Sequence, residues 1–338
     1  MKILIIKHGA LGDVVRTSFA LTGLKERFGE HCKIDWLTRS ECVPLIQYHP
    51  LLEEIWVRKD GRLVSQTDEA WEEGRSYDWV ISLDDEAEAV SVLEKSHFKK
   101  LTGMYLSQGK PSYTEDARLW FDMGLISKYG KSEADRLKRE NRLTHRQMLE
   151  KILDIQILRP EFYNDPLVEE EVSKHFACGR EKGLRVGLNL GAGSRWPSKQ
   201  MPEEEIIKLI QVLGGRSAEI YLFSAPEDRV PEGWIKKAAV ELTWIQPATL
   251  NHFAAWLSHM DRMISSDSLG MHLGIAQKIP VVCYFAPTSA DEIDLFGRGI
   301  KVVSESDDYC SYQPSADNST LTVSRVAEAF GRLINGLC

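Results

Sequence analysis

The feature that most constrains the fold is an alternation of short apolar runs with amphipathic stretches, which occurs twice along the chain. In the first half, the apolar runs predict four strands, at Lys2–Lys7, Lys33–Thr38, Ile55–Val57 and Trp79–Leu83. The residues after the first run carry apolar side chains near helical spacing and predict a helix over Val14–Phe28. Strands that alternate with helices in this way form a parallel sheet covered on both faces.

The same alternation restarts near residue 184. It predicts strands at Leu184–Leu190, Glu219–Ser224, Arg262–Ser265 and Pro280–Phe285. It predicts helices at Pro202–Leu213, Leu250–Leu257 and Met271–Ala276. A polar stretch between Pro160 and Gly183 predicts the divide between the halves. Because 338 residues suffice for two domains with separate cores, we expect an α/β protein of two doubly wound domains, 1–165 and 180–320, with a C-terminal segment 321–338.

Charge and composition exclude several classes of protein. The net charge of −8 argues against general nucleic-acid binding, which usually needs a basic balance. No apolar run approaches the roughly 18 residues of a membrane helix, and the first run, Ile3–Ile6, is too short for a signal peptide, so we expect a cytoplasmic protein. The six cysteines never occur at C-x-x-C spacing, which argues against a zinc site.

The first candidate functional segment, His8–Asp13, links the first predicted strand to the first helix. Gly9 and Gly12 allow a tight turn and a close approach of a ligand to the backbone. Asp13 would sit at the start of the helix, either as a catalytic carboxylate or only as a cap or first-turn charge. The loop lacks the G-x-G-x-x-G pattern and the second strand ends without an acidic residue, so a nicotinamide-dependent oxidoreductase is disfavoured.

Two loops of the second half also follow strands. The segment Asn189–Lys199 contains Gly191, Ala192 and Ser194, whose backbone N–H groups could receive a phosphate, and ends at Lys199, which suits a diphosphate unless it is only a surface lysine. The segment Ser265–His272 could add the N–H groups of a helix start. Its members Ser268 and His272 are candidate contacts, although a lone histidine is more often a buried core residue.

The segment 113–146 interrupts the α/β pattern. From Lys128 to Arg146 it carries seven basic residues against three acidic ones. One interpretation is a solvated helix face, and the other is a contact surface for an anionic acceptor or an anionic membrane.

Six segments in order along the chain resemble glycosyltransferase family 9, the heptosyltransferases of lipopolysaccharide core assembly. They are KILIIKHGALGDVVRTSFALTGLKERF, YDWVISLDDE, VGLNLGAGSRWPSKQMP, FSAPEDR, SSDSLGMHLGIAQKIPVVCYF and TVSRVAEAF. The resemblance implies a GT-B fold, in which two Rossmann-like domains face each other across a cleft, the N-terminal one binding the acceptor and the C-terminal one the nucleotide sugar. It also implies that the final helix, within 321–338, packs back on the N-terminal domain.

The resemblance carries roles onto particular residues. It makes Asp13 the general base, with Gly9 and Gly12 on the acceptor side, and Glu227 the residue that holds the ribose. The expected donor-binding residues are Gly191, Ala192, Ser194, Lys199, Glu227, Asp267, Ser268, Gly270, Met271 and His272. The family commonly has glycine directly after the serine or threonine of the last motif, whereas this chain has Leu269 and then Gly270.

By resemblance, the chemistry is an inverting, metal-independent transfer of heptose from ADP-heptose to a lipopolysaccharide core or related acceptor. No cofactor is expected, since the ADP-sugar is a substrate, and no strict Asp-x-Asp occurs; Asp84-Asp85-Glu86 is the nearest approach. The expected partners are the nucleotide sugar and an anionic glycolipid or saccharide, with room for peripheral contact with the cytoplasmic face of the inner membrane. The alternatives are a transferase with another nucleotide sugar or acceptor, the disfavoured oxidoreductase, and a silent sugar-nucleotide binding protein.

Overall fold

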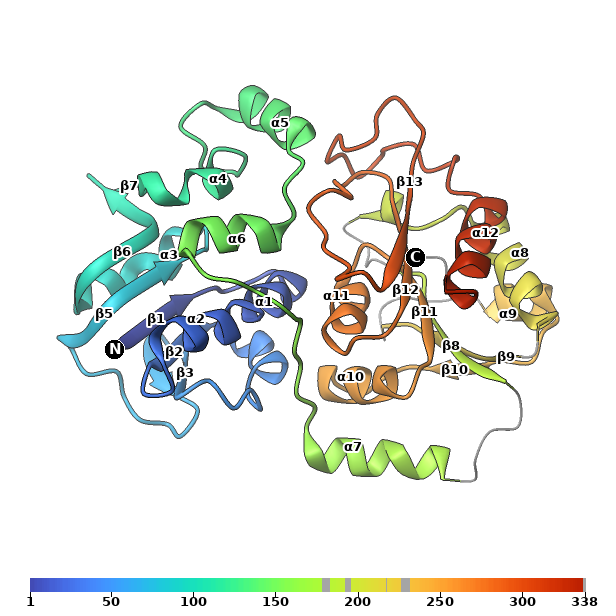
Figure 1. Ribbon diagram of the computed structural model, residues 1–338, viewed down its shortest axis with the longest axis horizontal. Helices are drawn as coiled ribbons and strands as arrows, with labels where there is room; N and C mark the ends of the chain where they lie inside the picture. The colour runs from blue at the N-terminus through green and yellow to red at the C-terminus, as the bar shows by residue number, and fades with distance from the viewer. Residues whose placement is uncertain (178–182, 192–195, 217, 226–231, 337–338) are drawn as a thin grey trace. The chain divides into compact units, whose positions relative to one another are not determined.

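The computed structural model describes residues 1–177, 183–191, 196–216, 218–225 and 232–336. The chain forms two compact units, Met1–Tyr163 (unit 1) and Asn164–Cys338 (unit 2). In Figure 1, unit 1 runs from blue to green and unit 2 from green to red. Each unit has one sheet of mainly parallel strands, as the alternating pattern predicted.

The sheet of unit 1 has the strand order β4-β3-β2-β1-β5-β6-β7. Its strands are β1 (Lys2–Ile6), β2 (Lys33–Thr38), β3 (Glu54–Lys59), β4 (Arg62–Ser65), β5 (Arg75–Ser82), β6 (Ser96–Ser107) and β7 (Lys110–Tyr113). The five inner strands β3, β2, β1, β5 and β6 are parallel. The edge strand β4 forms an antiparallel hairpin with β3, and the edge strand β7 forms one with β6. Ile3, Leu4, Ile5 and Ile6 are all buried, because helices cover both faces of a parallel sheet.

The helices of unit 1 differ in detail from the prediction. They are α1 (Leu11–Ser18), α2 (Ala20–Phe28), η1 (Ser40–Leu45), α3 (Ala87–Val90), η2 (Ser91–Lys95), η3 (Glu115–Ala117), α4 (Arg118–Phe121), α5 (Lys131–Glu140) and α6 (His145–Leu153). The single helix predicted from Val14 is two helices, and the first begins three residues earlier. At the break, the Ser18 and Thr22 hydroxyls donate to backbone carbonyls of the preceding turn, a contact that competes with regular helix geometry.

The sheet of unit 2 is fully parallel, in the order β10-β9-β8-β11-β12-β13. Its strands are β8 (Leu184–Asn189), β9 (Ala218–Phe223), β10 (Thr243–Ile245), β11 (Arg262–Ser266), β12 (Val281–Phe285) and β13 (Gly299–Val303). Counted from the first strand, this is the 3-2-1-4-5-6 order of a dinucleotide-binding fold. Its helices are α7 (Pro166–Ser173), η4 (Lys174–Phe176), η5 (Pro197–Lys199), α8 (Glu203–Gly214), α9 (Glu232–Ala238), α10 (Leu250–Ser258), α11 (Leu269–Ala276) and α12 (Val323–Ile334).

The last helix belongs to the core of unit 2, where α12 buries Val326, Phe330 and Leu333. These residues share one helix face, and α8, β12 and β13 supply the apolar surface that covers it. The expectation that residues 321–338 also pack back on the N-terminal domain stays a prediction.

The predicted divide contains α7, which belongs to unit 2. Its Glu169 accepts a hydrogen bond from Ser258 of α10 at 3.0 Å and lies 3.2 Å from the Nε2 atom of His259. These contacts fix α7 to the second unit, so the chain passes from one unit to the other directly after Tyr163.

Candidate functional site

Two loops of unit 2 meet where the strand order of its sheet reverses. Strands β8 and β11 are parallel neighbours, and the helices that follow them belong to opposite directions of winding. Asn189, at the end of β8, donates from Nδ2 to the Oγ atoms of Ser265 (3.0 Å) and Ser268 (2.7 Å). Ser266 donates to the carbonyl of Gly191 at 2.6 Å. Open α/β sheets bind their ligands at this switch point, so the predicted loops are brought together where a ligand is expected.

Lys199 and Asp267 form an ion pair between these loops. The Nζ atom of Lys199 lies 2.7 Å from Oδ2 of Asp267 and also donates to the backbone carbonyl of Asp267 at 3.0 Å. Thr288 donates to the same Oδ2 atom at 2.6 Å. Burial by itself raises the pKa of Asp267, but the charges of Lys199 and His272 and these hydrogen bonds hold it below its usual value. The carboxylate therefore stays ionised and fixes the position of the lysine ammonium.

Helix α11 begins at this pair. Its N-cap is Ser268, and all its residues from Gly270 to Ala276 are buried. His272, one turn into the helix, is only 8% exposed and interacts electrostatically with Asp267. Met271 is fully buried, and its predicted contact with the donor stays a prediction.

Gly270 has a structural reason to lack a side chain. A Cβ atom there would lie 2.5 Å from the Nδ2 atom of Asn189. The glycine therefore allows the start of α11 to pack directly against the end of β8.

Three predicted donor-binding residues lie outside the described residues. They are Ala192, Ser194 and Glu227. Their roles, including the proposed ribose contact, stay predictions.

The corresponding switch point of unit 1 holds Asp13. The helix begins at Leu11 after the N-cap Ala10, so Gly12 and Asp13 occupy its first turn, whereas Gly9 precedes it. Oδ1 of Asp13 lies 2.8 Å from the Nη2 atom of Arg16, and Oδ2 lies 4.0 Å from Nζ of Lys7. The side chain of Asp13 is 30% exposed, so it is open to solvent. The carboxylate is thus a first-turn charge held by two cations and not the cap of the helix.

Sequence reasoning missed the residues that surround Asp13. Asp84, two residues after the end of β5, is buried; its Oδ2 atom accepts the backbone N–H of His8 at 2.8 Å and lies 3.6 Å from Nζ of Lys7. Burial raises the pKa of the neighbouring Asp85. The signal was available, since β5 pairs with β1 and their ends lie at one edge of the sheet. Knowledge of the strand order would have placed Leu83-Asp84-Asp85 beside the His8 loop.

The basic segment 113–146 contains helix α5, whose charges are largely paired within the helix. Lys131 pairs with Asp135, and Arg136 lies 2.6 Å from Glu133 and also contacts Glu140. These pairs favour the interpretation of a solvated helix face.

The described residues contain no group of three or more His, Cys, Asp or Glu side chains placed to hold a metal ion. Within the same residues, no helix has both the length and the apolar character to cross a membrane.

Residues 163–322, which include both loops of the unit 2 switch point, match the sequence model of glycosyltransferase family 9 (heptosyltransferase). This match supports a heptosyltransferase-like glycosyltransferase of family 9. The match begins at the boundary between the units and ends just before α12. No curated protein sequence matches the chain.

Solved structures confirm the predicted GT-B fold of this chain. The family 9 glycosyltransferase of Veillonella parvula DSM 2008 is 16% identical, with a TM-score of 0.69 over 99% of this chain and 97% of the other. The E. coli ADP-heptose lipopolysaccharide heptosyltransferase II is 16% identical, with a TM-score of 0.65 over 99% of both chains. The E. coli heptosyltransferase WaaC with ADP is 18% identical, with a TM-score of 0.62 over 100% of this chain and 99% of the other.

Proposed function

We propose that this glycosyltransferase moves a heptose from ADP-heptose to a hydroxyl of a lipopolysaccharide core saccharide, with inversion and without a metal ion. The observation that carries the proposal is the buried Lys199–Asp267 pair at the start of α11, inside the segment that matches family 9. Two of the similar structures are an ADP-heptose lipopolysaccharide heptosyltransferase and a heptosyltransferase with ADP, which supports the choice of donor. A lipid-linked acceptor would bring the enzyme to the cytoplasmic face of the inner membrane.

The donor half of the reaction needs positive charge where the diphosphate departs. The ammonium of Lys199 has three donors, and Asp267 receives two of them. We assign the third to the diphosphate, together with His272 and the first-turn N–H groups of α11, which carry the positive end of the helix dipole. Donors fixed in advance stabilise charge that develops in the transition state without reorganising. Asp267 supplies that fixation.

The acceptor half needs a base, and Asp13 is the residue we assign to it. Its carboxylate takes the proton of the acceptor hydroxyl while the oxygen attacks the anomeric carbon. The bond from that carbon to the diphosphate oxygen breaks on the opposite face, and ADP leaves with the electron pair. Lys7 and Arg16 hold the carboxylate from two sides, which orients it before the reaction.

A donor panel tests the proposal. Release of nucleotide is measured with lipopolysaccharide core acceptor and with ADP-heptose, ADP-glucose, UDP-glucose or GDP-mannose. ADP-heptose should exceed ADP-glucose, its match in nucleotide, by about 100-fold in kcat/KM. The product should show the opposite anomeric configuration to the donor by NMR. Preference for UDP-glucose or GDP-mannose, or retention of configuration, contradicts the proposal.

A further inference from the structure

A groove in unit 1 has no role in the mechanism above. It has a volume of about 560 Å³, within the range of about 300–1,000 Å³ that is typical of small-molecule sites. Its walls come from η1 and the turn after it, from β3, and from β4 with the turn that follows. We call it the hairpin groove, after the β3–β4 hairpin.

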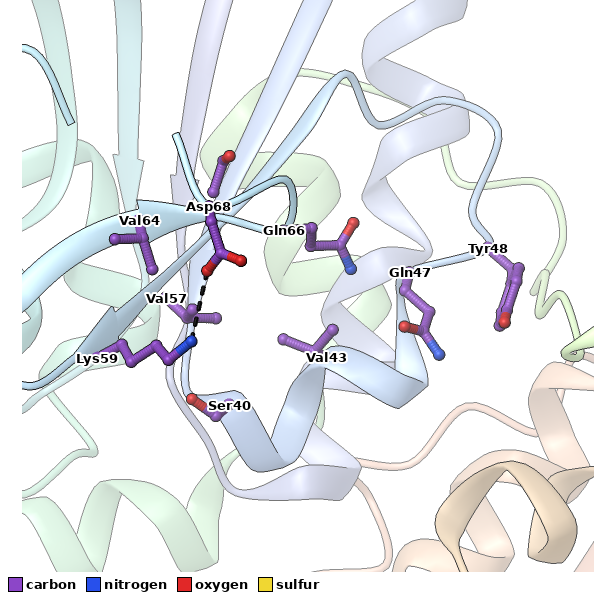
Figure 2. Close-up of a pocket in the computed structure, with 10 residues that line it drawn as sticks. Ser40, Val43, Gln47, Tyr48, Val57, Lys59, Val64, Gln66 and Asp68 are labelled. Carbon is purple, nitrogen blue, oxygen red and sulfur yellow. Dashed lines mark hydrogen bonds and ion pairs between the residues drawn. The ribbon is translucent and has the colours of Figure 1, made fainter. Parts of the chain in front are cut away.

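The floor of the hairpin groove is apolar and its rim is polar. Figure 2 shows Val43, Val57 and Val64 pointing toward the central space, and the amides of Gln47 and Gln66 at its side. Each glutamine amide offers both donors and an acceptor. A floor of methyl groups below such amides matches a ring that has an apolar C–H face and hydroxyls at its edge.

The groove carries no net charge. Its only charged lining residues are Lys59 and Asp68, whose side chains lie 3.4 Å apart as an exposed ion pair. An acidic ligand would meet a lysine that already has a carboxylate partner. The lining therefore favours an uncharged ligand over a carboxylated or phosphorylated one.

The turn that presents Gln66 is internally braced. The Oγ atom of Ser65, a buried residue, accepts the backbone N–H groups of Thr67 (3.2 Å) and Glu69 (3.1 Å) and shares a hydrogen bond with the Thr67 hydroxyl at 2.9 Å. The backbone N–H of Asp68 donates to the Ser65 carbonyl. The backbone that carries Gln66 is thus held in place before any ligand binds, and the side chain of Gln66 is exposed.

The hairpin groove is also tied to the loop that leads to Asp13. Cys42 of η1 donates from Sγ to the carbonyl of His8 at 3.1 Å, and η1 packs against α1. Both η1 and the His8 loop follow neighbouring parallel strands, so they share one edge of the sheet. A ligand in the groove would be positioned relative to the proposed base by contacts within unit 1 alone.

We propose that the hairpin groove binds an uncharged sugar residue of the acceptor. This inference rests on the proposed function, because it assigns the groove to the acceptor half of that reaction. The groove would select acceptors by a neutral saccharide unit, through Gln47 and Gln66, rather than by an acidic group.

Ligand-observed NMR on the full chain tests the assignment with methyl glycosides of glucose, galactose and mannose and with the matched methyl uronides. We expect at least one neutral glycoside to bind in the millimolar range and its uronide to bind about tenfold more weakly. Gln66→Leu should weaken binding of that glycoside about tenfold, the usual effect of a lost hydrogen bond, and Ser40→Trp, which fills the groove from its exposed rim, should abolish it. Gln156→Leu, at an exposed glutamine of unit 1 that does not line the groove, should bind like the parent.

The inference is overturned if no neutral glycoside binds, if uronides bind equally well, or if both groove variants bind like the parent. Urea denaturation should give both Gln66→Leu and Ser40→Trp the same cooperative unfolding as the parent, which shows that unit 1 folds in these variants. Turnover of ADP-heptose separates the two proposals. If Ser40→Trp keeps the parental turnover and acceptor KM, the groove is not an acceptor site, and the donor assignment is unaffected. If the parent does not use ADP-heptose but binds glycosides in the groove, only the proposed function is wrong.

Discussion

Lys199 and Asp267 make an ion pair of 2.7 Å in which the side chains are only 17% and 10% exposed. Lys208 and Glu205, in the same unit, pair at the same distance, but Lys208 is 53% exposed. The two pairs differ mainly in burial, and burial decides how much an uncompensated partner costs. The chain thus contains its own control for the proposed donor site.

Lys199→Ala should lower the free energy of unfolding by about 3 kcal/mol, because it leaves the buried carboxylate of Asp267 without its charged partner. Lys208→Ala should change it by less than about 1 kcal/mol. Urea denaturation of both variants measures the difference.

The same variant should weaken ADP binding by about 10- to 100-fold in calorimetry, the contribution of a charge-assisted hydrogen bond. Turnover should fall further than binding, since the charge on the leaving group is largest in the transition state. Parental ADP affinity in a folded Lys199→Ala protein would leave the lysine with a structural role only.

Local sequence was sufficient to predict the buried strands. The run of residues 184–190 is mainly apolar and is followed by glycine, and β8 occupies nearly that range. Local sequence was insufficient to predict β6, because Lys99 and Lys100 interrupt its apolar pattern. That strand forms because it pairs with β5, and the Lys100 ammonium lies over the ring of Trp79 at 4.0 Å. Such stabilisation depends on residues about twenty positions away.

In the candidate site, too, local sequence predicted some features and others depended on the tertiary structure. The glycine-rich loops and Asp13 were recognisable because each directly follows a strand. The pairing of Lys199 with Asp267, 68 residues apart, required the strand order of the sheet. The final helix was expected only from the resemblance of the segment TVSRVAEAF, and no local signal says which domain covers its apolar face.

Gly270→Ala should lower stability by about 1–3 kcal/mol and weaken ADP binding, because the added Cβ would lie 2.5 Å from the Asn189 amide and displace α11. Gly331→Ala in α12, where a Cβ meets no atom within 4 Å, should instead raise stability by about 0.5–1 kcal/mol. Thermal unfolding and ADP titration of the two variants check this. Equal effects of the two substitutions would contradict the packing argument.

Asp13→Asn should lower turnover by roughly 10²–10⁴-fold, the usual contribution of acid–base catalysis, because the amide keeps the shape and loses the basicity. ADP affinity should stay parental, since the donor contacts are assigned to unit 2. Asp135→Asn removes a carboxylate that pairs with Lys131 within α5 and should leave turnover unchanged. Near-parental turnover of Asp13→Asn would remove this residue from the role of base.

Transfer should persist in excess EDTA. The proposed clamp uses Lys199, His272 and the start of α11 to hold the diphosphate, so a divalent cation has no assigned task. The measurement is the initial rate with and without chelator. Loss of transfer that Mg²⁺ or Mn²⁺ restores would require a different account of the leaving group.

His49 should make the protein less stable as the pH falls from about 6.5 to 4. Its side chain is buried against the ring of Tyr163, and burial lowers its pKa to about 4, whereas an unfolded histidine titrates near 6.5. Between these pH values His49 is protonated in the unfolded chain but not in the folded chain. The free energy of unfolding therefore falls progressively below pH 6.5, by up to about 3 kcal/mol. Urea denaturation at pH 7.5, 5.5 and 4 should show that the free energy of unfolding falls less with pH for His49→Gln than for the parent. If the free energy of unfolding falls equally with pH in the parent and in His49→Gln, then His49 has the same pKa in the folded and unfolded chains.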